Sequence, residues 1–257
     1  MNIELHAKNA NVNNHFYNKY PENEGYLEIE NIDAFVRDAA ETIINNYEKP
    51  LVKKLISEHY KSLSDEEKNI IFCTVCDCLD SDEYTVNEKL AVIESELKDY
   101  FTEFRNINIE GFVSFRLEKY IDILVDIISA VLEEKLAAEE RAEFCGVMRG
   151  YLEMQVSVYD YLEVIVFKDK FKLLNENNED ITKEAIMSCF SNNVGMFFRA
   201  DDLLLNLLII TAPKKVVLHK GDVNPHTELY EVLNGIFGSR ISVCSGCKLC
   251  NTDREVK

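Results

Sequence analysis

The sequence predicts an α+β protein, in which a mostly helical N-terminal region is followed by a small α/β C-terminal domain. Two observations carry this prediction. From residue 32 to about residue 153, apolar residues recur at the spacing of three and four that is typical of amphipathic helices. After residue 155, short β-branched and aromatic runs alternate with helical patterns. We therefore expect a polar segment over 1–30, a helical domain over 31–155 and an α/β domain over 156–257.

The polar N-terminal segment is rich in asparagine and contains scattered aromatic residues. Ile3 and Leu5 alternate with polar neighbours, which indicates a short strand near residues 2–7. Residues 6–23 are predicted to form a loop, because turn-favouring residues dominate there.

The helical domain is predicted to begin near Ile32, and Pro50 stands where a new helix can start. Ser64 and Glu67 have the spacing of a capping box, in which each residue accepts a hydrogen bond from the backbone amide of the other. A further helix is expected over residues 87–104.

The longest helical stretch is predicted to open at Gly111, and its apolar stripe includes Phe115. A second helix is expected to start near Ala138. An apolar stripe this wide is typical of a helix that packs in a bundle core.

The α/β domain is predicted to open with a β-hairpin, formed by strands over 161–167 and 171–174. A helix can follow over 181–190, and Asp201 and Asp202 are expected to cap an apolar helix over 203–212.

A strand–helix–strand unit is predicted next, over residues 213–219, 225–237 and 241–243. Gly238 is well placed to end the helix. A βαβ unit of this length implies parallel strands. Ligand-binding groups collect at the carboxyl ends of such strands, where His219 and Cys244 fall.

The formal charge of −18, from 28 basic and 46 acidic residues, disfavours binding to nucleic acid or to an anionic membrane. The first residues lack the basic and apolar pattern of a secretory signal. The longest apolar run, Leu203–Ala212, is too short to span a bilayer. We therefore expect a cytoplasmic protein whose eight cysteines are thiols, metal ligands or core residues rather than disulfides.

Three cysteines with two residues between successive members, Cys244, Cys247 and Cys250, are the strongest chemical signal in the chain. A C-x-x-C pair is the usual way for one loop to offer two thiolates to one metal ion. Tetrahedral zinc needs four donors, so a fourth ligand is required. The candidates are His219, Cys189, Asp222 or a residue of a second chain.

The sequence does not decide whether these cysteines bind an iron–sulfur cluster, a structural zinc ion, a catalytic zinc ion or no metal. An iron–sulfur cluster of the ferredoxin kind would have a fourth cysteine followed by proline, and the chain has neither there. Zinc held by four protein donors would be structural, whereas three donors and a water molecule would suit hydrolytic chemistry. The remaining interpretation is a tail whose thiols bind nothing.

The other cysteines and histidines have weaker patterns. Three cysteines lie in a helical apolar pattern and are expected to fill a core: Cys73, Cys76 and Cys78. His226 is expected in the first turn of a helix. The remaining histidines lack ligand partners nearby in the sequence: His6, His15 and His59.

Four sequence blocks resemble the YtxC-like family of sporulation proteins from endospore-forming Firmicutes. They are GFVSFRLEKY at 111–120 and the segments 136–155, 202–219 and 236–250. The resemblance covers roughly residues 31–250. It implies a cytoplasmic protein of a sporulating Gram-positive cell, and it implies no reaction and no catalytic residue.

The sequence contains no nucleotide-binding glycine loop, no zinc-protease motif and no hydrolase elbow. Our first hypothesis is a non-enzymatic interaction or regulatory protein that binds a protein partner and holds a structural metal. The alternative is a metal- or thiol-dependent enzyme that uses Cys244, Cys247 and Cys250 with His219. A third hypothesis, nucleic-acid binding through the cysteine tail, is opposed by the net charge.

Overall fold

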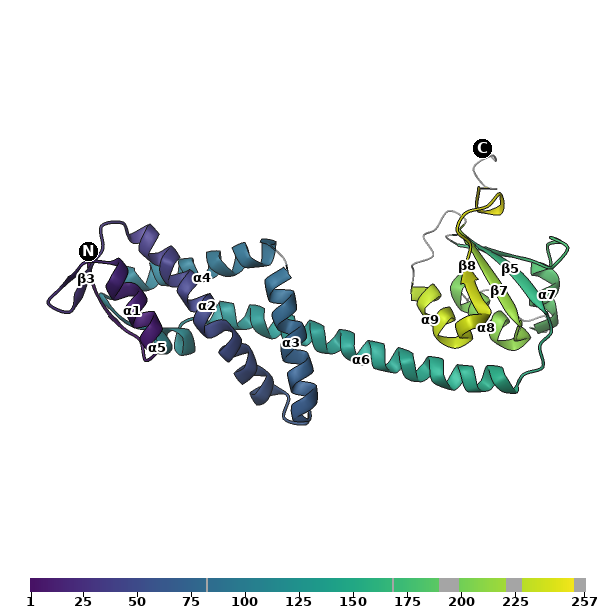
Figure 1. Ribbon diagram of the computed structural model, residues 1–257, viewed down its shortest axis with the longest axis horizontal. Coiled ribbons are helices and arrows are strands. Elements are labelled where there is room, and N and C mark those ends of the chain that lie inside the picture. The colour runs from purple at the N-terminus through teal and green to yellow at the C-terminus, as the bar shows by residue number, and fades with distance from the viewer. Residues whose placement is uncertain (82, 168, 190–198, 221–227, 252–257) are drawn as a thin grey trace. The chain divides into compact units, whose positions relative to one another are not determined.

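The computed structural model describes the whole chain except residues 82, 168, 190–198, 221–227 and 252–257 (Figure 1). The chain divides into two compact units, Met1–Leu136 and Ala137–Lys257. The first unit is mainly helical and the second is built on a four-stranded sheet, which confirms the α+β class.

The first unit packs helices around a core that contains Phe16, Phe35 and Tyr120. A small sheet of order β2-β3-β1-β4 lies at its N-terminal end, with β1 parallel to β4 and antiparallel to β3. Its elements are β1 (Asn2–His6), α1 (Ala10–Lys19), β2 (Glu22–Asn23), β3 (Tyr26–Glu28), α2 (Ile32–His59), α3 (Asp65–Ser81), α4 (Glu83–Glu103), β4 (Asn106–Asn108), α5 (Ile109–Phe115) and the start of α6 (Glu118–Met154).

The polar N-terminal segment is folded, so the predicted loop over 6–23 is wrong, whereas the strand near 2–7 is confirmed as β1. The Asn9 side chain caps α1 by accepting a hydrogen bond from the backbone amide of Asn11. Only Val12 and Phe16 of α1 are buried. Two apolar contacts among many asparagines give too sparse a pattern for the helix to be read from the sequence.

Two predicted helix boundaries have opposite outcomes. The capping box is confirmed, because the Ser64 amide donates to Glu67 Oε2 at 2.8 Å and the Glu67 amide donates to Ser64 Oγ at 3.3 Å. The new helix at Pro50 is wrong, because α2 runs through this residue. Proline in a helix interior costs about 3 kcal/mol. Packing offsets that cost, since Ile43 and Val52 on either side of it are both buried.

The two helices predicted to start at Gly111 and near Ala138 have different bounds in the structure. The helix that starts near Gly111 ends at Phe115, because Arg116 leaves the helical conformation with φ −125° and ψ −11°. The next helix, α6, then runs for 37 residues without a new start at Ala138. Phe115 is exposed rather than in the core. None of the helices within the described ranges is long and apolar enough to cross a membrane.

The second unit contains a sheet of order β6-β5-β7-β8. The predicted hairpin is confirmed by antiparallel pairing of β5 with β6, and the predicted parallel strands by the pairing of β7 with β8. β5 is also parallel to β7. The elements are β5 (Tyr161–Val166), β6 (Phe171–Leu174), α7 (Thr182–Cys189), α8 (Ala200–Thr211), β7 (Lys215–Lys220), α9 (Glu228–Phe237), β8 (Ile241–Val243) and two 3-10 turns, Gly238–Arg240 and Leu249–Asn251.

The helix ends of this unit follow the predictions only in part. Gly238 has φ +52° and ends α9, as predicted. Asp201 and Asp202 lie in the first turn of α8, and Arg199 occupies the capping position instead. The expected start of α9 at residues 225–227 lies outside the described residues. The expected domain boundary near residue 155 coincides with the end of α6, whereas the compact units divide earlier, inside that helix.

The two faces of the C-terminal sheet are covered very differently. One face packs on side chains of α6 to α9 in a single core, which includes Leu162, Val164, Val216, Leu218, Ile241, Cys145, Leu152, Leu204, Leu208 and Leu233. On the opposite face, Ile165, Phe167 and Leu174 pack against Leu249 of the C-terminal tail. Side chains alternate along a strand, so Glu163 and His219 also point to this second face.

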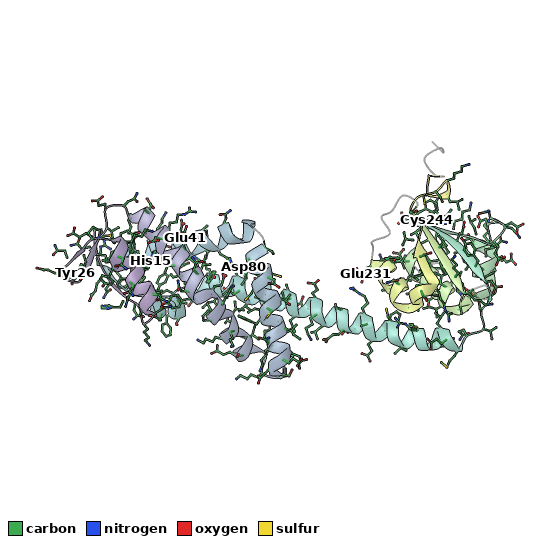
Figure 2. The ribbon with its side chains drawn as sticks, viewed as in Figure 1. His15, Tyr26, Glu41, Asp80, Glu231 and Cys244 are labelled. Carbon is green, nitrogen blue, oxygen red and sulfur yellow. The ribbon has the colours of Figure 1, made fainter. Side chains whose placement is uncertain are left out.

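The C-terminal half of α6 packs tightly on α9. A Cβ atom added to Gly235 would lie 2.7 Å from Cys145 Sγ, so this close approach requires glycine. At the rim of the contact, Arg141 donates a hydrogen bond to Glu231 at 2.9 Å. Figure 2 labels Glu231 on α9. The Cys145 and Gly235 contact therefore fixes how close α9 lies to α6.

A buried ionic group stands in the core of the first unit. Lys89 Nζ lies 2.9 Å from Glu48 Oε2 and donates to the Leu79 carbonyl oxygen at 3.3 Å. The Tyr120 hydroxyl donates to the same carboxylate. All three side chains of this group, Glu48, Lys89 and Tyr120, are buried. Burial, and then the charge of Glu48, raise the pKa of Tyr120 far above its ordinary value.

We expect Lys89→Met to destabilise the first unit by roughly 3–5 kcal/mol, because it leaves the Glu48 carboxylate buried without its cation. The measurement is urea unfolding followed by circular dichroism. Lys98→Met is the matched control: Lys98 pairs with Asp33 at 2.9 Å on the surface, where solvent screens an ion pair and its loss should have little effect. Equal effects of the two substitutions would contradict the expectation.

Candidate metal centre

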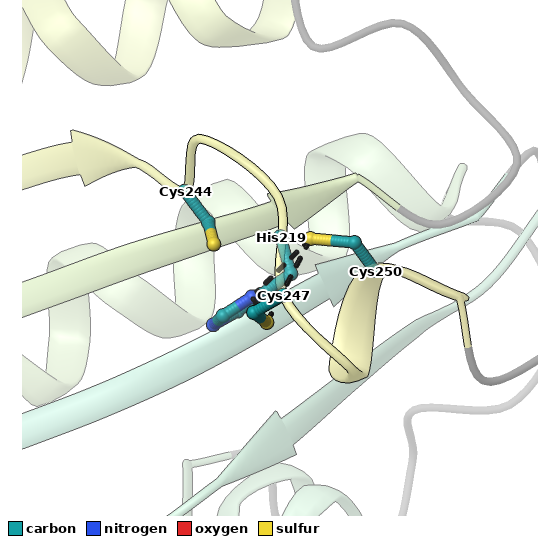
Figure 3. Close-up of side chains that lie close together, drawn as sticks. All are labelled: His219, Cys244, Cys247 and Cys250. Atoms are coloured by element: carbon teal, nitrogen blue, oxygen red, sulfur yellow. Dashed lines mark hydrogen bonds between the residues drawn. The ribbon is translucent and has the colours of Figure 1, made fainter.

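Four predicted ligand side chains meet on the second face of the C-terminal sheet (Figure 3). His219 Nδ1 lies 3.3 Å from Cys247 Sγ and 3.6 Å from Cys250 Sγ. The sulfur atoms of Cys247 and Cys250 are 3.9 Å apart. Together with Cys244, one donor atom from each residue lies within 4.8 Å of all the others.

These separations suit one tetrahedral ion. Zn–S bonds of about 2.3 Å and Zn–N bonds of about 2.0–2.1 Å place the ligand atoms of a tetrahedron about 3.5–3.8 Å apart. The 3.3, 3.6 and 3.9 Å separations lie close to that range. A cluster distributes its cysteines over several iron atoms, so its thiolates stand further apart. A Cys₃His set is a usual ligand set for structural zinc.

The strand pairing explains how ligands distant in sequence meet. Leu218 of β7 pairs in register with Val243 of β8, and the Cys244 amide donates to the Leu218 carbonyl oxygen at 2.8 Å. Cys244 therefore leaves β8 level with His219 at the end of β7. Gly246 has φ +123°, a conformation that favours glycine, and the turn it makes leads Cys247 back over the sheet.

The end of the tail is held by its own short hydrogen bonds. The Gly246 amide lies 3.5 Å from Cys244 Sγ, and the Cys250 amide donates to the Cys247 carbonyl oxygen at 3.2 Å. Local turns thus bring the three thiols of the C-x-x-C-x-x-C motif into one small volume. His219 completes the set from β7.

Among the candidates for the fourth ligand, His219 is the one that lies with the three cysteines in the group formed by described residues. Cys189 is not a member of that group and ends α7. Asp222 and His226 lie outside the described residues. His219 is 4% exposed, so it belongs to the interior of the second face rather than to the protein surface.

A carboxylate faces the other nitrogen of the His219 ring. His219 Nε2 and Glu163 Oε2 lie 3.7 Å apart, and both atoms are buried with no hydrogen-bond partner among the described residues. Tyr161 holds the second oxygen of this carboxylate by donating to Glu163 Oε1 at 2.8 Å. A ligated histidine commonly turns its free N–H toward such a carboxylate. A metal at Nδ1 would leave that proton on Nε2, where Glu163 can accept it.

The histidine and the thiols have perturbed acidities. Burial lowers the pKa of His219 below its ordinary value, although the charge of Glu163 raises it, and a neutral imidazole is the form that binds metal. Burial would raise the pKa of Cys247, but the backbone amides of Cys250 and Leu249 lower it below the ordinary thiol value. The Gly246 amide lowers the pKa of Cys244, but burial and the neighbouring thiols outweigh it, so the pKa of Cys244 is raised above the ordinary thiol value.

The expected core role of the other C-x-x-C segment holds for one residue. Cys76 is buried in α3, whereas Cys73 and Cys78 are exposed, which corrects the expectation for these two. On the helix surface they are ordinary exposed thiols.

A polar cluster around Asp38 was not predicted. His15 Nε2 lies 3.0 Å from the carboxylate of the buried Asp38, which is distant in the sequence. Lys19 Nζ donates a hydrogen bond to the same carboxylate at 2.6 Å. The Tyr20 hydroxyl also donates to it, at 3.1 Å. Burial would raise the pKa of Asp38, but Lys19, His15 and Tyr20 lower it below its ordinary value. The sequence signal for this cluster was the spacing of four residues between His15 and Lys19, which places them on one side of a helix. The predicted loop over 6–23 hid that signal.

The comparisons with known proteins give one match. The sequence pattern of the YtxC-like family matches residues 36–242, which include His219 and end just before Cys244. No curated protein matches the chain, and no solved structure matches it.

We expect Glu163→Gln to weaken zinc binding by roughly 10- to 100-fold, because the amide cannot stabilise the Nε2–H of His219 as a carboxylate does. Competition against a chromophoric chelator measures this affinity. Glu176→Gln, an exposed residue of the same unit, is the control and should bind zinc as the wild type does. An unchanged affinity in Glu163→Gln would contradict a role for Glu163 in positioning His219.

Proposed function

The chain belongs to the YtxC-like family, and we propose that it is a sporulation-associated cytoplasmic protein that acts by binding a protein partner. In this proposal it catalyses no reaction, and Cys244, Cys247, Cys250 and His219 hold a structural zinc ion. The link to sporulation comes from the family resemblance. The net charge of −18 argues for a protein partner rather than for nucleic acid or an anionic membrane.

The observation that carries the metal part is the meeting of four donor atoms within 4.8 Å. Four protein donors fill a tetrahedral site and leave no position for a catalytic water molecule, which is the usual arrangement of structural zinc. Zinc bound there would tie the tail to β7 through His219. A reducing cytoplasm would keep the three thiols available as ligands.

The stabilising effect of such an ion would be local. The tail contributes Leu249 to a small apolar cluster with Ile165, Phe167 and Leu174. A cluster of this size buries little surface, and metal binding to a folded site adds its free energy to folding. We therefore infer that zinc keeps this face of the sheet covered.

The alternative function is a metal- or thiol-dependent enzyme that uses the same residues. Each of the three thiols is partly exposed, so a small molecule can reach them. This function requires one protein donor to leave, so that a water molecule or substrate occupies the fourth position. Cobalt substitution separates the two functions, because the visible spectrum of a closed tetrahedral Cys₃His site does not respond to added small-molecule ligands.

Elemental analysis of anaerobically purified protein is the direct test. We expect about one zinc ion per chain in the wild type and almost none in Cys244→Ser/Cys247→Ser, because two of the four donors are removed. The matched control is Cys73→Ser/Cys78→Ser, which also removes two thiols but from the exposed face of α3. It should retain its zinc.

Three results would contradict the proposal. They are a wild type without metal, zinc that persists in Cys244→Ser/Cys247→Ser, and a control that loses zinc as readily as the site variant. Reproducible turnover of a small metabolite by the zinc-loaded protein would favour the enzyme instead.

A further inference from the structure

The C-terminal half of α6 carries an apolar stripe on the side that does not pack on α9. The stripe consists of Phe144, Val147, Tyr151 and Met154, and between 42% and 77% of each residue is exposed. Their spacing of three, four and three residues is that of a coiled-coil seam. The opposite side of the same helix buries Cys145 and Leu152 in the core of the unit. The stripe is therefore a second apolar face.

Two glycines border this stripe. Gly150 lies one helical turn from both Val147 and Met154, and Gly146 lies one turn before Gly150. A Cβ atom added at either glycine would meet no other atom within 4 Å. Glycine inside a helix costs about 1 kcal/mol relative to alanine, and no contact with the described residues accounts for that cost here. Two small residues beside an apolar seam allow another helix to approach closely.

The exposed apolar area is large enough to form an interface. Val156 and Val158 follow the end of the helix in sequence and are also exposed, by 87% and 62%. With about 200 Å² for a fully exposed large side chain, the six residues offer roughly 750 Å². The largest apolar patch of a typical monomer is about 300–600 Å². A stable protein interface buries about 800 Å² on each partner, which this stripe and its borders nearly supply.

We propose that the occupant of this face is the same face of a second copy, with the two α6 helices antiparallel about a twofold axis. A self-complementary patch is what a twofold dimer requires. In the antiparallel register that centres on residue 149, Val147 lies against Tyr151 of the second copy and Phe144 against Met154. The smaller Val147 then meets the larger Tyr151, Phe144 packs against the flexible Met154, and the glycines lie at the crossing.

The charges beside the stripe select this orientation. Glu140 and Glu143 lie on the same side of α6, two turns and one turn before Val147, respectively. Parallel helices would place these carboxylates against their own copies, which is unfavourable. The antiparallel register instead places Glu143 beside the uncharged Gln155 of the second copy. The dimer does not depend on the metal centre, so each proposal can fail alone.

Light scattering of the full-length protein after size-exclusion chromatography tests the dimer, at concentrations up to about 100 μM. The wild type should have the mass of two chains. Val147→Glu/Tyr151→Glu should have the mass of one chain, with a dissociation constant raised by roughly 100-fold or more, because four carboxylates would meet in the seam. Both positions are exposed in the chain, so the fold should persist, and circular dichroism checks it.

A charge-reversed variant tests the register. In Val147→Glu/Tyr151→Lys, each glutamate should lie against a lysine of the second copy, so dimerisation should return. Met187→Glu, at an exposed apolar residue of α7, is the control and should remain dimeric. A wild type that stays monomeric up to about 100 μM, or a Val147→Glu/Tyr151→Glu variant that stays dimeric, would overturn the proposal. A monomeric Val147→Glu/Tyr151→Lys would overturn the antiparallel register.

Discussion

The unequal covering of the C-terminal sheet is the constraint on which the rest of this unit depends. Helices α6 to α9 bury one face, and the other face is left to a tail of irregular chain. In the described part of the tail, Leu249 is the residue that packs against the apolar cluster of this face, and a cluster of that size buries little area. A metal ion bound by the four candidate ligands would attach the tail to the sheet, since His219 belongs to the sheet and the three cysteines to the tail. One ion would therefore hold this tail against the face as helices α6 to α9 hold the other.

The sequence predicted what depends on local spacing. The C-x-x-C-x-x-C run predicted a site of Cys244, Cys247 and Cys250, and the βαβ unit made His219 one of several candidates for the fourth ligand. The structure places His219 in that group. Glu163 was not predictable as their neighbour, because the register that pairs Ile165 with His219 is set between distant strands. Likewise, α2 continues through Pro50 because of tertiary packing that no local pattern encodes.

Helix α6 shows why a wide apolar stripe is ambiguous in a sequence. Its C-terminal half carries Cys145 and Leu152 toward α9, and Val147 and Tyr151 away from it. Read together, these residues suggest one broad buried face, as in a bundle core. The structure separates them into two faces. The glycines differ accordingly, because Gly235 has a neighbour that excludes any side chain, whereas Gly146 and Gly150 have open space around them.

The contact between Gly235 and Cys145 has a practical consequence for spectroscopy of the thiols. Attaching probes to chosen cysteines requires the remaining ones to be replaced, and Cys145 is one of them. Its sulfur fills the only space that a Cβ atom on Gly235 would otherwise enter. A branched replacement at residue 145 would push α9 away from α6, whereas alanine leaves room to spare. The side chains at residues 145 and 235 share one small space between α6 and α9, so their sizes have to be chosen together.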